Sequence, residues 1–288
     1  MSSKITVGGQ AVIEGVMMRS LDKYVIAVRR PDKKISTKEF PINSSKSKYA
    51  TLPITRGIIK FAETLVIGVK SITYSANEAV GEEEQLTAKE LYMTVAFSVF
   101  MTIALFYLLP LTLTKVFTKS GGVFFNLIDG FLRITIFLAY LLGISLLSDV
   151  RRLFQYHGAE HKAVHCYEAG KKLTVKNVQS FTTLHPRCGT SFILIVFIIS
   201  ILFFSLFPVS GYIDRLLLRL LLLPVIAGVS YELLRASGKH SEKGIVKFFI
   251  YPGLMLQKIT TKEPTDDMVE VAIKSLKLAL PKKEVKVA

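Results

Sequence analysis

The sequence predicts a mainly α-helical membrane protein with four transmembrane helices. Half of its 288 residues are hydrophobic. Four stretches combine high hydrophobicity with few or no charges, and each is long enough as a helix to cross a hydrocarbon core about 30 Å thick. We expect them to form two hairpins. They cover residues 91–114, 128–148, 190–213 and 216–234.

Within this membrane region, residues 91–234, the second stretch carries two charges near its start. Asp129 and Arg133 are four positions apart, so they share a helical face and can pair with each other near the membrane surface. The polar segment 149–190 separates the two hairpins. We expect it to form a histidine-rich cytoplasmic loop.

A small β-containing cytoplasmic region is predicted within residues 1–90. Residues 5–19 mix apolar side chains with three glycines, which suits a strand with a tight turn or a close backbone approach. Backbone N–H groups in such a glycine-rich segment could also hold an anion. Residues 24–30 and 35–40 flank a Pro-Asp-Lys-Lys sequence, a typical turn composition, and are predicted to pair as a hairpin.

Three further segments complete the predicted cytoplasmic part. Residues 54–79 have a helical period but carry several charges, so they suit an interfacial or core helix, and the acidic run at 81–85 suits a solvated linker. Residues 235–288 form a tail whose apolar part, 244–257, is expected to lie along the membrane interface. The tail ends in a predicted amphipathic helix over 265–280, with an apolar stripe formed by Val269, Ile273, Leu276 and Leu280.

The distribution of basic residues predicts the orientation in the membrane. The net charge is +15, and the middle loop, 149–190, alone holds seven Lys and Arg. Because cytoplasmic loops are enriched in basic residues, this loop and both termini are expected in the cytoplasm of a multi-pass cell-membrane protein. The positive charge then suits contact with anionic lipid. It is spread beside the spanning helices without a recognised binding motif, which argues against nucleic acid as a partner.

The most informative stretch is YHGAEHKAVHCYE at residues 156–168. We expect it to be the cytoplasmic continuation of the second spanning helix. On a helix its histidines and glutamates fall within roughly 140° of the surface, because each residue turns by about 100°. These residues are His157, Glu160, His161, His165 and Glu168.

This pattern predicts a site for a divalent metal, with zinc as the preferred ion. Two histidines four residues apart can share one ion, whereas His157 and His165 are about 12 Å apart along the helix axis. The pair is therefore either His157 with His161 or His161 with His165. Residues 157–161 also fit the H-x-x-E-H pattern, in which two histidines bind zinc and Glu160 acts as the general base.

The remaining ligands must come from elsewhere in the chain. One candidate is Glu168, at the end of the same stretch. The others are His185 and Cys188 in the nearby HPRCGTSF sequence, and the distant Glu232. Arg187 or Arg19 could stabilise developing negative charge. The same histidine face could instead form a structural polar network or an exposed basic-aromatic interface. Cys166 points away from this face and is expected to serve packing.

Several of these motifs together resemble a known family. GGQAVIEGVMMR (8–19), YHGAEHKAVHCYE (156–168), HPRCGTSF (185–192) and KEPTDDMVEVAI (262–273) are similar to the bacterial YqhQ-like family, whose domain is classified as of unknown function. The resemblance covers nearly the whole chain. It implies a multi-pass bacterial membrane protein that is a predicted metal-dependent enzyme. It does not identify a substrate.

Two functions of different classes follow. The preferred one is a membrane-anchored metal-dependent enzyme, a hydrolase acting at the cytoplasmic surface on a lipid-linked or membrane-protein substrate. The alternative is a non-enzymatic scaffold or assembly factor that binds a protein partner or anionic lipid. A small transporter is disfavoured, because the ionisable groups of the spanning stretches lie near their outer ends.

Overall fold

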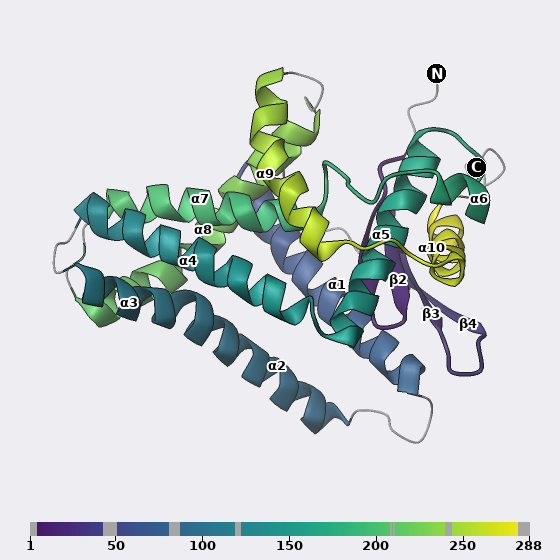
Figure 1. The fold of residues 1–288 in the computed structure, drawn as a ribbon, viewed down its shortest axis with the longest axis horizontal. Helices are drawn as coiled ribbons and strands as arrows, with labels where there is room; N and C mark the ends of the chain where they lie inside the picture. The colour runs from purple at the N-terminus through teal and green to yellow at the C-terminus, as the bar shows by residue number, and fades with distance from the viewer. Residues whose placement is uncertain are drawn as a thin grey trace.

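The fold has two parts, a bundle of apolar helices and a layered α/β part beside it (Figure 1). The computed structural model describes residues 5–42, 51–80, 87–118, 122–207, 209, 211–239 and 244–281. The linker predicted at 81–85 lies outside these residues. The predicted helical and strand segments are present, but several helix ends differ from the prediction by four or more residues.

The N-terminal region forms a four-stranded antiparallel sheet in which each strand pairs with the next in sequence. The first two strands form a hairpin around a two-residue turn, where Glu14 has a φ of 51°. The Pro-Asp-Lys-Lys sequence connects the last two strands, as predicted. The strands are β1 (Gly8–Val12), β2 (Gly15–Arg19), β3 (Lys23–Arg29) and β4 (Ile35–Pro41).

The two inner strands of this sheet, β2 and β3, are buried on both faces, which explains why they are apolar at successive positions. Side chains alternate between the faces of a strand. Val16 and Met18 therefore pack on α5 (Ser148–Glu168) and α10 (Asp266–Ala279), while Met17 packs on the other side towards α1 (Thr55–Val80). The sheet thus forms the middle layer of three (Figure 1).

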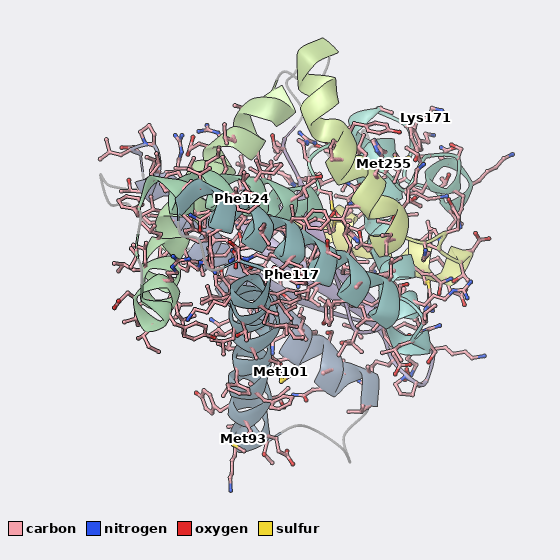
Figure 2. All side chains as sticks on the ribbon, turned by 60° about the vertical axis from the view of Figure 1, so that its left-hand side comes forward. Met93, Met101, Phe117, Phe124, Lys171 and Met255 are labelled. Carbon is pink, nitrogen blue, oxygen red and sulfur yellow. The ribbon has the colours of Figure 1, made fainter. Side chains whose placement is uncertain are left out.

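Four helical segments of the described chain are long and apolar enough to cross a membrane. The first begins as α2 and passes through the π-helical segment η2 into α3. Met93 and Met101 mark α2, which diverges from the other helices and has no buried residue (Figure 2). The segments are α2 (Ala88–Ile103) with η2 (Ala104–Leu108) and α3 (Leu109–Phe117), α4 (Gly122–Ile144), α7 (Gly189–Leu206) and α8 (Tyr212–Lys239).

The expected continuation of the second spanning helix into the histidine motif is wrong. Helix α4 ends at Ile144, and α5 begins at Ser148 after a short turn. Leu147 has an extended backbone, with ψ of 134°. This break turns α5 away from the apolar bundle and lays it across the sheet (Figure 1).

Helix α1 joins the two parts of the molecule. It covers one face of the sheet and also packs along α8. The two helices meet at Gly57 and Gly228, where a Cβ on Gly57 would lie 2.5 Å from the Gly228 carbonyl oxygen. Beside this crossing, Arg56 forms a bidentate ion pair with Glu232 at 3.0 and 2.5 Å. Of the charged residues that made α1 unsuitable as a spanning helix, Arg56 therefore fastens it to the bundle, and Glu63 pairs with Arg19 of the sheet.

The C-terminal tail returns to the layered part. Helix α9 (Gly244–Thr260) packs against α7, and the chain then crosses α5 to reach α10. Thr265 is the N-cap of α10 and two aspartates occupy its first turn, where negative charge favours the helix dipole. The predicted apolar stripe of α10 is buried against the sheet and α5.

Candidate metal centre

Helix α5 places the histidine motif between the sheet and the C-terminal segment. Ala159 and Ala163 face the apolar core, and their small side chains allow the helix to lie close to its neighbours. Gly158 is in tighter contact still, since a Cβ there would lie 2.1 Å from the Lys262 carbonyl oxygen. Lys262 in turn donates its backbone N–H to the Phe154 carbonyl. The chain after α9 is thereby held against one turn of α5.

Two histidines of this helix meet a cysteine from the following loop. His157, His161 and Cys188 offer ligand atoms that all lie within 4.8 Å of one another. The His157 Nε2 and Cys188 Sγ atoms are 3.3 Å apart. Cys188 is also the N-cap of α7, and its sulfur accepts from the Thr190 N–H.

Hydrogen bonds to backbone carbonyls orient both imidazoles. His157 Nδ1 lies 2.8 Å from the Thr260 carbonyl oxygen, and His161 Nδ1 lies 2.5 Å from that of Thr183. A carbonyl only accepts, so each Nδ1 carries the proton. In the neutral ring each Nε2 then presents a lone pair. Burial lowers the pKa of His161, which favours this neutral form.

The Glu160 carboxyl lies next to both of these nitrogens. Its Oε2 is 3.5 Å from His161 Nε2 and 4.0 Å from His157 Nε2. The side chain is buried, and burial raises the pKa of the carboxyl, against the opposing effects of His157, His185 and the Gly9 N–H. A buried carboxyl beside two ligand-type nitrogens is suited to accept a proton from a reacting molecule.

The glycine-rich strand β1 completes the surroundings of Glu160. The Gly9 N–H donates to the carboxyl, and a Cβ on Gly9 would lie 2.7 Å from the Glu160 Cγ. The sequence predicted a close backbone approach and a possible anion contact in this segment. The structure confirms the close approach and places the Glu160 side chain there, 151 positions along the chain.

A second cluster lies one turn further along α5 and contains His165, Glu168 and His185. Here the His185 and Glu168 side chains are paired with each other, and His165 contacts a backbone carbonyl. His185 Nδ1 accepts from the Arg187 N–H at 3.2 Å, so in the neutral ring Nε2 carries the proton and donates to Glu168 at 3.3 Å. Glu168 also forms an ion pair with Arg187, and His165 Nε2 lies 2.8 Å from the Leu184 carbonyl oxygen.

The loop that carries His185 and Cys188 is held by one buried residue of α9. Gln257 accepts the His185 N–H at 2.8 Å and donates to the His185 carbonyl at 2.9 Å. It is completely buried. This paired contact fixes the backbone of the HPRC sequence relative to α5, and with it the position of the cysteine.

The structure divides the six predicted ligands into these two groups of three. Two other candidates lie in different contacts: Glu232 binds Arg56, and Arg19 pairs with Glu63 at 2.6 Å. Cys166 is buried in the core, as expected. Sequence reasoning missed Gly158, Thr183, Gln257 and Thr260. Of these, only Gly158 left a signal in the sequence, as a small residue between candidate site residues.

The fold and the site define a class: a protein with four membrane-length apolar helices and a buried His/His/Cys cluster on a sheet-supported helix. The chain belongs to the family described as "Protein of unknown function (DUF1385)", whose model matches residues 52–282. It is 35% identical over 287 residues to "Uncharacterized protein YqhQ" of Bacillus subtilis (strain 168), covering 93% of this chain and 90% of that protein. The family resemblance of the sequence motifs is thus confirmed. No solved structure matches significantly.

Proposed function

We propose that this protein is a membrane-anchored, metal-dependent hydrolase that binds a divalent ion, preferentially zinc, through His157, His161 and Cys188. The observation that carries the proposal is the pair of Nδ1–H contacts to backbone carbonyls, which leaves both Nε2 lone pairs beside Cys188 Sγ. Carbonyl or carboxylate partners on the second ring nitrogen are the usual support of zinc-binding histidines. Imidazole and thiolate are ligands that zinc prefers.

Three protein ligands with a neighbouring carboxyl favour a catalytic site over a structural one. Structural zinc sites have four protein ligands, whereas catalytic sites have three and keep one position for a reactant. A divalent metal bound here would supply a Lewis acid for a carbonyl or phosphoryl oxygen. Glu160 accepts a proton from the attacking water, and Gly9 holds its carboxyl in place. Arg187 and Glu168 act as positioning residues that fix the turn before Cys188.

The location of the site suggests the class of substrate. His157 is nine residues from the start of α5 at Ser148, or about 14 Å along the axis. That start follows directly after the apolar helix α4. With the four apolar helices in the cell membrane and the basic segments in the cytoplasm, the site lies near the inner membrane surface. A lipid-linked or membrane-protein substrate fits this position.

Cobalt substitution tests the site and its open position together. Purified protein in a mild detergent is expected to bind one Co²⁺ and to show thiolate-to-cobalt charge-transfer absorption that Cys188→Ser removes. Added azide is expected to shift the cobalt spectrum, because one position is free for an exchangeable ligand. A protein that binds no metal would sink the proposal. If cobalt binds but azide leaves its spectrum unchanged, the ion has no exchangeable ligand and the site is structural, not catalytic.

Glu160→Gln tests the hydrolase assignment. The change is expected to leave metal content intact and to slow turnover by about 10²–10⁴, the usual contribution of a general base. Uncleaved substrate should then accumulate, so lipids and peptides that co-purify with Glu160→Gln and wild type are compared by mass spectrometry. Glu270→Gln makes the same change at an exposed position of α10 and provides the control. Identical profiles for all three proteins argue against hydrolysis.

A second function is favoured by a separate observation, a basic groove at the opposite end of α5. The groove has a volume of about 690 Å³. Four of its lining residues are basic (Arg29, Arg30, Lys33 and Arg152) and two are acidic (Glu14 and Asp267), so the lining is basic on balance. It suits the alternative of a scaffold that binds anionic lipid. Vesicle flotation with and without phosphatidylglycerol tests whether the protein binds anionic lipid through this groove, as the scaffold requires. If Arg30→Glu abolishes cellular function while Glu160→Gln preserves it, the scaffold is correct and the hydrolase is not.

A further inference from the structure

A cluster of charged side chains lies buried inside the apolar bundle. Its members come from α4, where Arg133 is the twelfth of 23 residues, and from the first third of α8. Arg133 thus lies in the middle of α4, deeper than the end position that the sequence predicted, because α4 begins at Gly122. Asp129, Arg133 and Arg219 are only 1%, 3% and 2% exposed. Asp129 Oδ2 accepts from Arg133 at 2.9 Å, and Oδ1 accepts from Arg219 at the same distance. The pair predicted from the sequence is therefore part of a triad, whose third member comes from another helix.

The triad carries one positive charge in excess. Two guanidinium groups face a single carboxylate, and both oxygens of that carboxylate are engaged. Arg133 Nε and Arg219 Nη2 are buried and, in the part of the chain that the structure describes, have no hydrogen-bond partner. Burying an unbalanced charge and unpaired donors is unfavourable unless something compensates for them.

Aromatic rings provide only partial compensation. The Phe204 ring lies 5.4 Å from the Arg133 guanidinium and 5.1 Å from that of Arg219. Tyr107 adds a contact with Arg133 at 4.9 Å. Such contacts attract a cation through the ring face, but they do not satisfy N–H donors in the way that an anion does.

A small cavity is lined in part by Arg219. Its volume is about 10 Å³, and Arg219, Arg215, Asn126 and Phe204 are among the residues that line it. This is room for roughly one water-sized particle. Arg215 adds a further cation, and its Nε donates to the Val209 carbonyl at 2.6 Å. A cavity of this size, next to a buried excess of positive charge, selects a small negative group.

We propose that this cavity binds one singly charged anion, either a halide or one phosphodiester oxygen of a phospholipid. The anion accepts from Arg219 Nη2 and balances the triad. The site is independent of the histidine cluster, which lies on a different helix beside the sheet. Its occupancy links α4 to α8 inside the bundle.

Thermal unfolding of the purified protein tests this site. The protein is held in a maltoside detergent at constant pH and ionic strength, with chloride or bromide replacing gluconate. Saturating halide is expected to raise Tm by about 5 °C, because a ligand at many times its Kd stabilises only the folded state. A parallel arm adds phosphatidylglycerol or a neutral glycolipid in gluconate. Stabilisation by phosphatidylglycerol alone identifies the phosphodiester as the source.

Arg219→Gln is the decisive variant. It removes the excess charge and leaves the Asp129–Arg133 pair, so it should be at least as stable as wild type in gluconate and lose the halide and lipid response. Arg235→Gln makes the same change at an exposed position of α8 and should keep the response. If Arg219→Gln fails to fold, the response of the wild-type Tm to halide and phosphatidylglycerol still tests whether the cavity binds an anion. A wild-type Tm that is insensitive to all three anions, or an equal response in folded Arg219→Gln, overturns the proposal.

Discussion

Two clusters of the same residue types lie side by side on α5, but their hydrogen bonds differ. In the cluster of His157, His161 and Cys188, each histidine donates its Nδ1–H to a backbone carbonyl oxygen. The ligand atoms that remain therefore face one another. In the cluster of His165, Glu168 and His185, His165 also contacts a backbone carbonyl, but His185 and Glu168 are paired with each other.

This difference teaches that the partner of the second ring nitrogen decides what a histidine cluster can bind. Proximity alone would rate both groups as metal sites, since each brings three candidate atoms within 4.8 Å. To bind an ion, the second cluster must first give up the His185–Glu168 hydrogen bond and weaken the Glu168–Arg187 ion pair. The first cluster gives up only the contact between a thiol and an imidazole.

The largest expected effect comes from removing one histidine of each cluster in turn. His161→Ala takes away one of three proposed ligands, so metal content should fall from about one ion per chain to background. His165→Ala, one turn along the same helix, should keep the full content. Elemental analysis of both purified variants measures this difference. Equal loss in both, or metal retained in His161→Ala, would contradict the distinction between the clusters.

A weaker effect is expected from Gly158→Ala, which leaves every ligand in place. The added Cβ would lie 2.1 Å from the Lys262 carbonyl oxygen, so the segment from Thr260 to Lys262 must move. His157 then loses its orienting contact with the Thr260 carbonyl. Loss of such a supporting contact lowers metal affinity by about 10–100-fold.

The control for this change is Gly143→Ala in α4, where an added Cβ meets nothing within 4 Å. Competition titration with a zinc chelator measures both affinities. The chelator titration also separates affinity from folding, which circular dichroism monitors independently. If Gly158→Ala binds zinc as tightly as Gly143→Ala, the carbonyl contact does not prepare the site.

Gln257→Met should affect the loop shared by both clusters. The change keeps the side-chain volume but leaves the buried N–H and carbonyl of His185 without their partner. An unsatisfied buried group costs about 1–3 kcal/mol. Chemical unfolding should show a loss of this size. Gln155→Met, at a half-exposed position that contacts the Glu263 carbonyl, should cost much less.

Much of this arrangement could be predicted from the sequence, because it depends on local pattern. The four apolar segments, the paired strands and the amphipathic helix α10 follow from hydrophobic period and turn residues. The spacing of the histidines excluded a site made by α5 alone, and the structure supplies Cys188 from the next loop. The family was also evident from the motifs.

What could not be predicted depends on contacts between distant segments. The break at residues 145–147 has no proline or glycine to mark it, and it decides where α5 lies. The contacts of Gly9 with Glu160 and of Thr260 with His157 join positions more than 100 residues apart. The preference for Cys188 over His185 as the third proposed metal ligand depends on which ring nitrogen of each histidine carries a proton. No spacing rule contains that information.

The smallest expected effect comes from Glu168→Gln, and it completes the comparison between the clusters. The Glu168 and Arg187 side chains are 34% and 37% exposed, so water screens their ion pair. Ion pairs of this kind contribute about 0–1 kcal/mol, and a glutamine oxygen can still accept from His185. Metal content should stay unchanged and the free energy of unfolding should fall by less than about 1 kcal/mol. A Glu168→Gln protein that loses its metal would instead place Glu168 among the ligands, and the two clusters would then have to be treated as one larger centre.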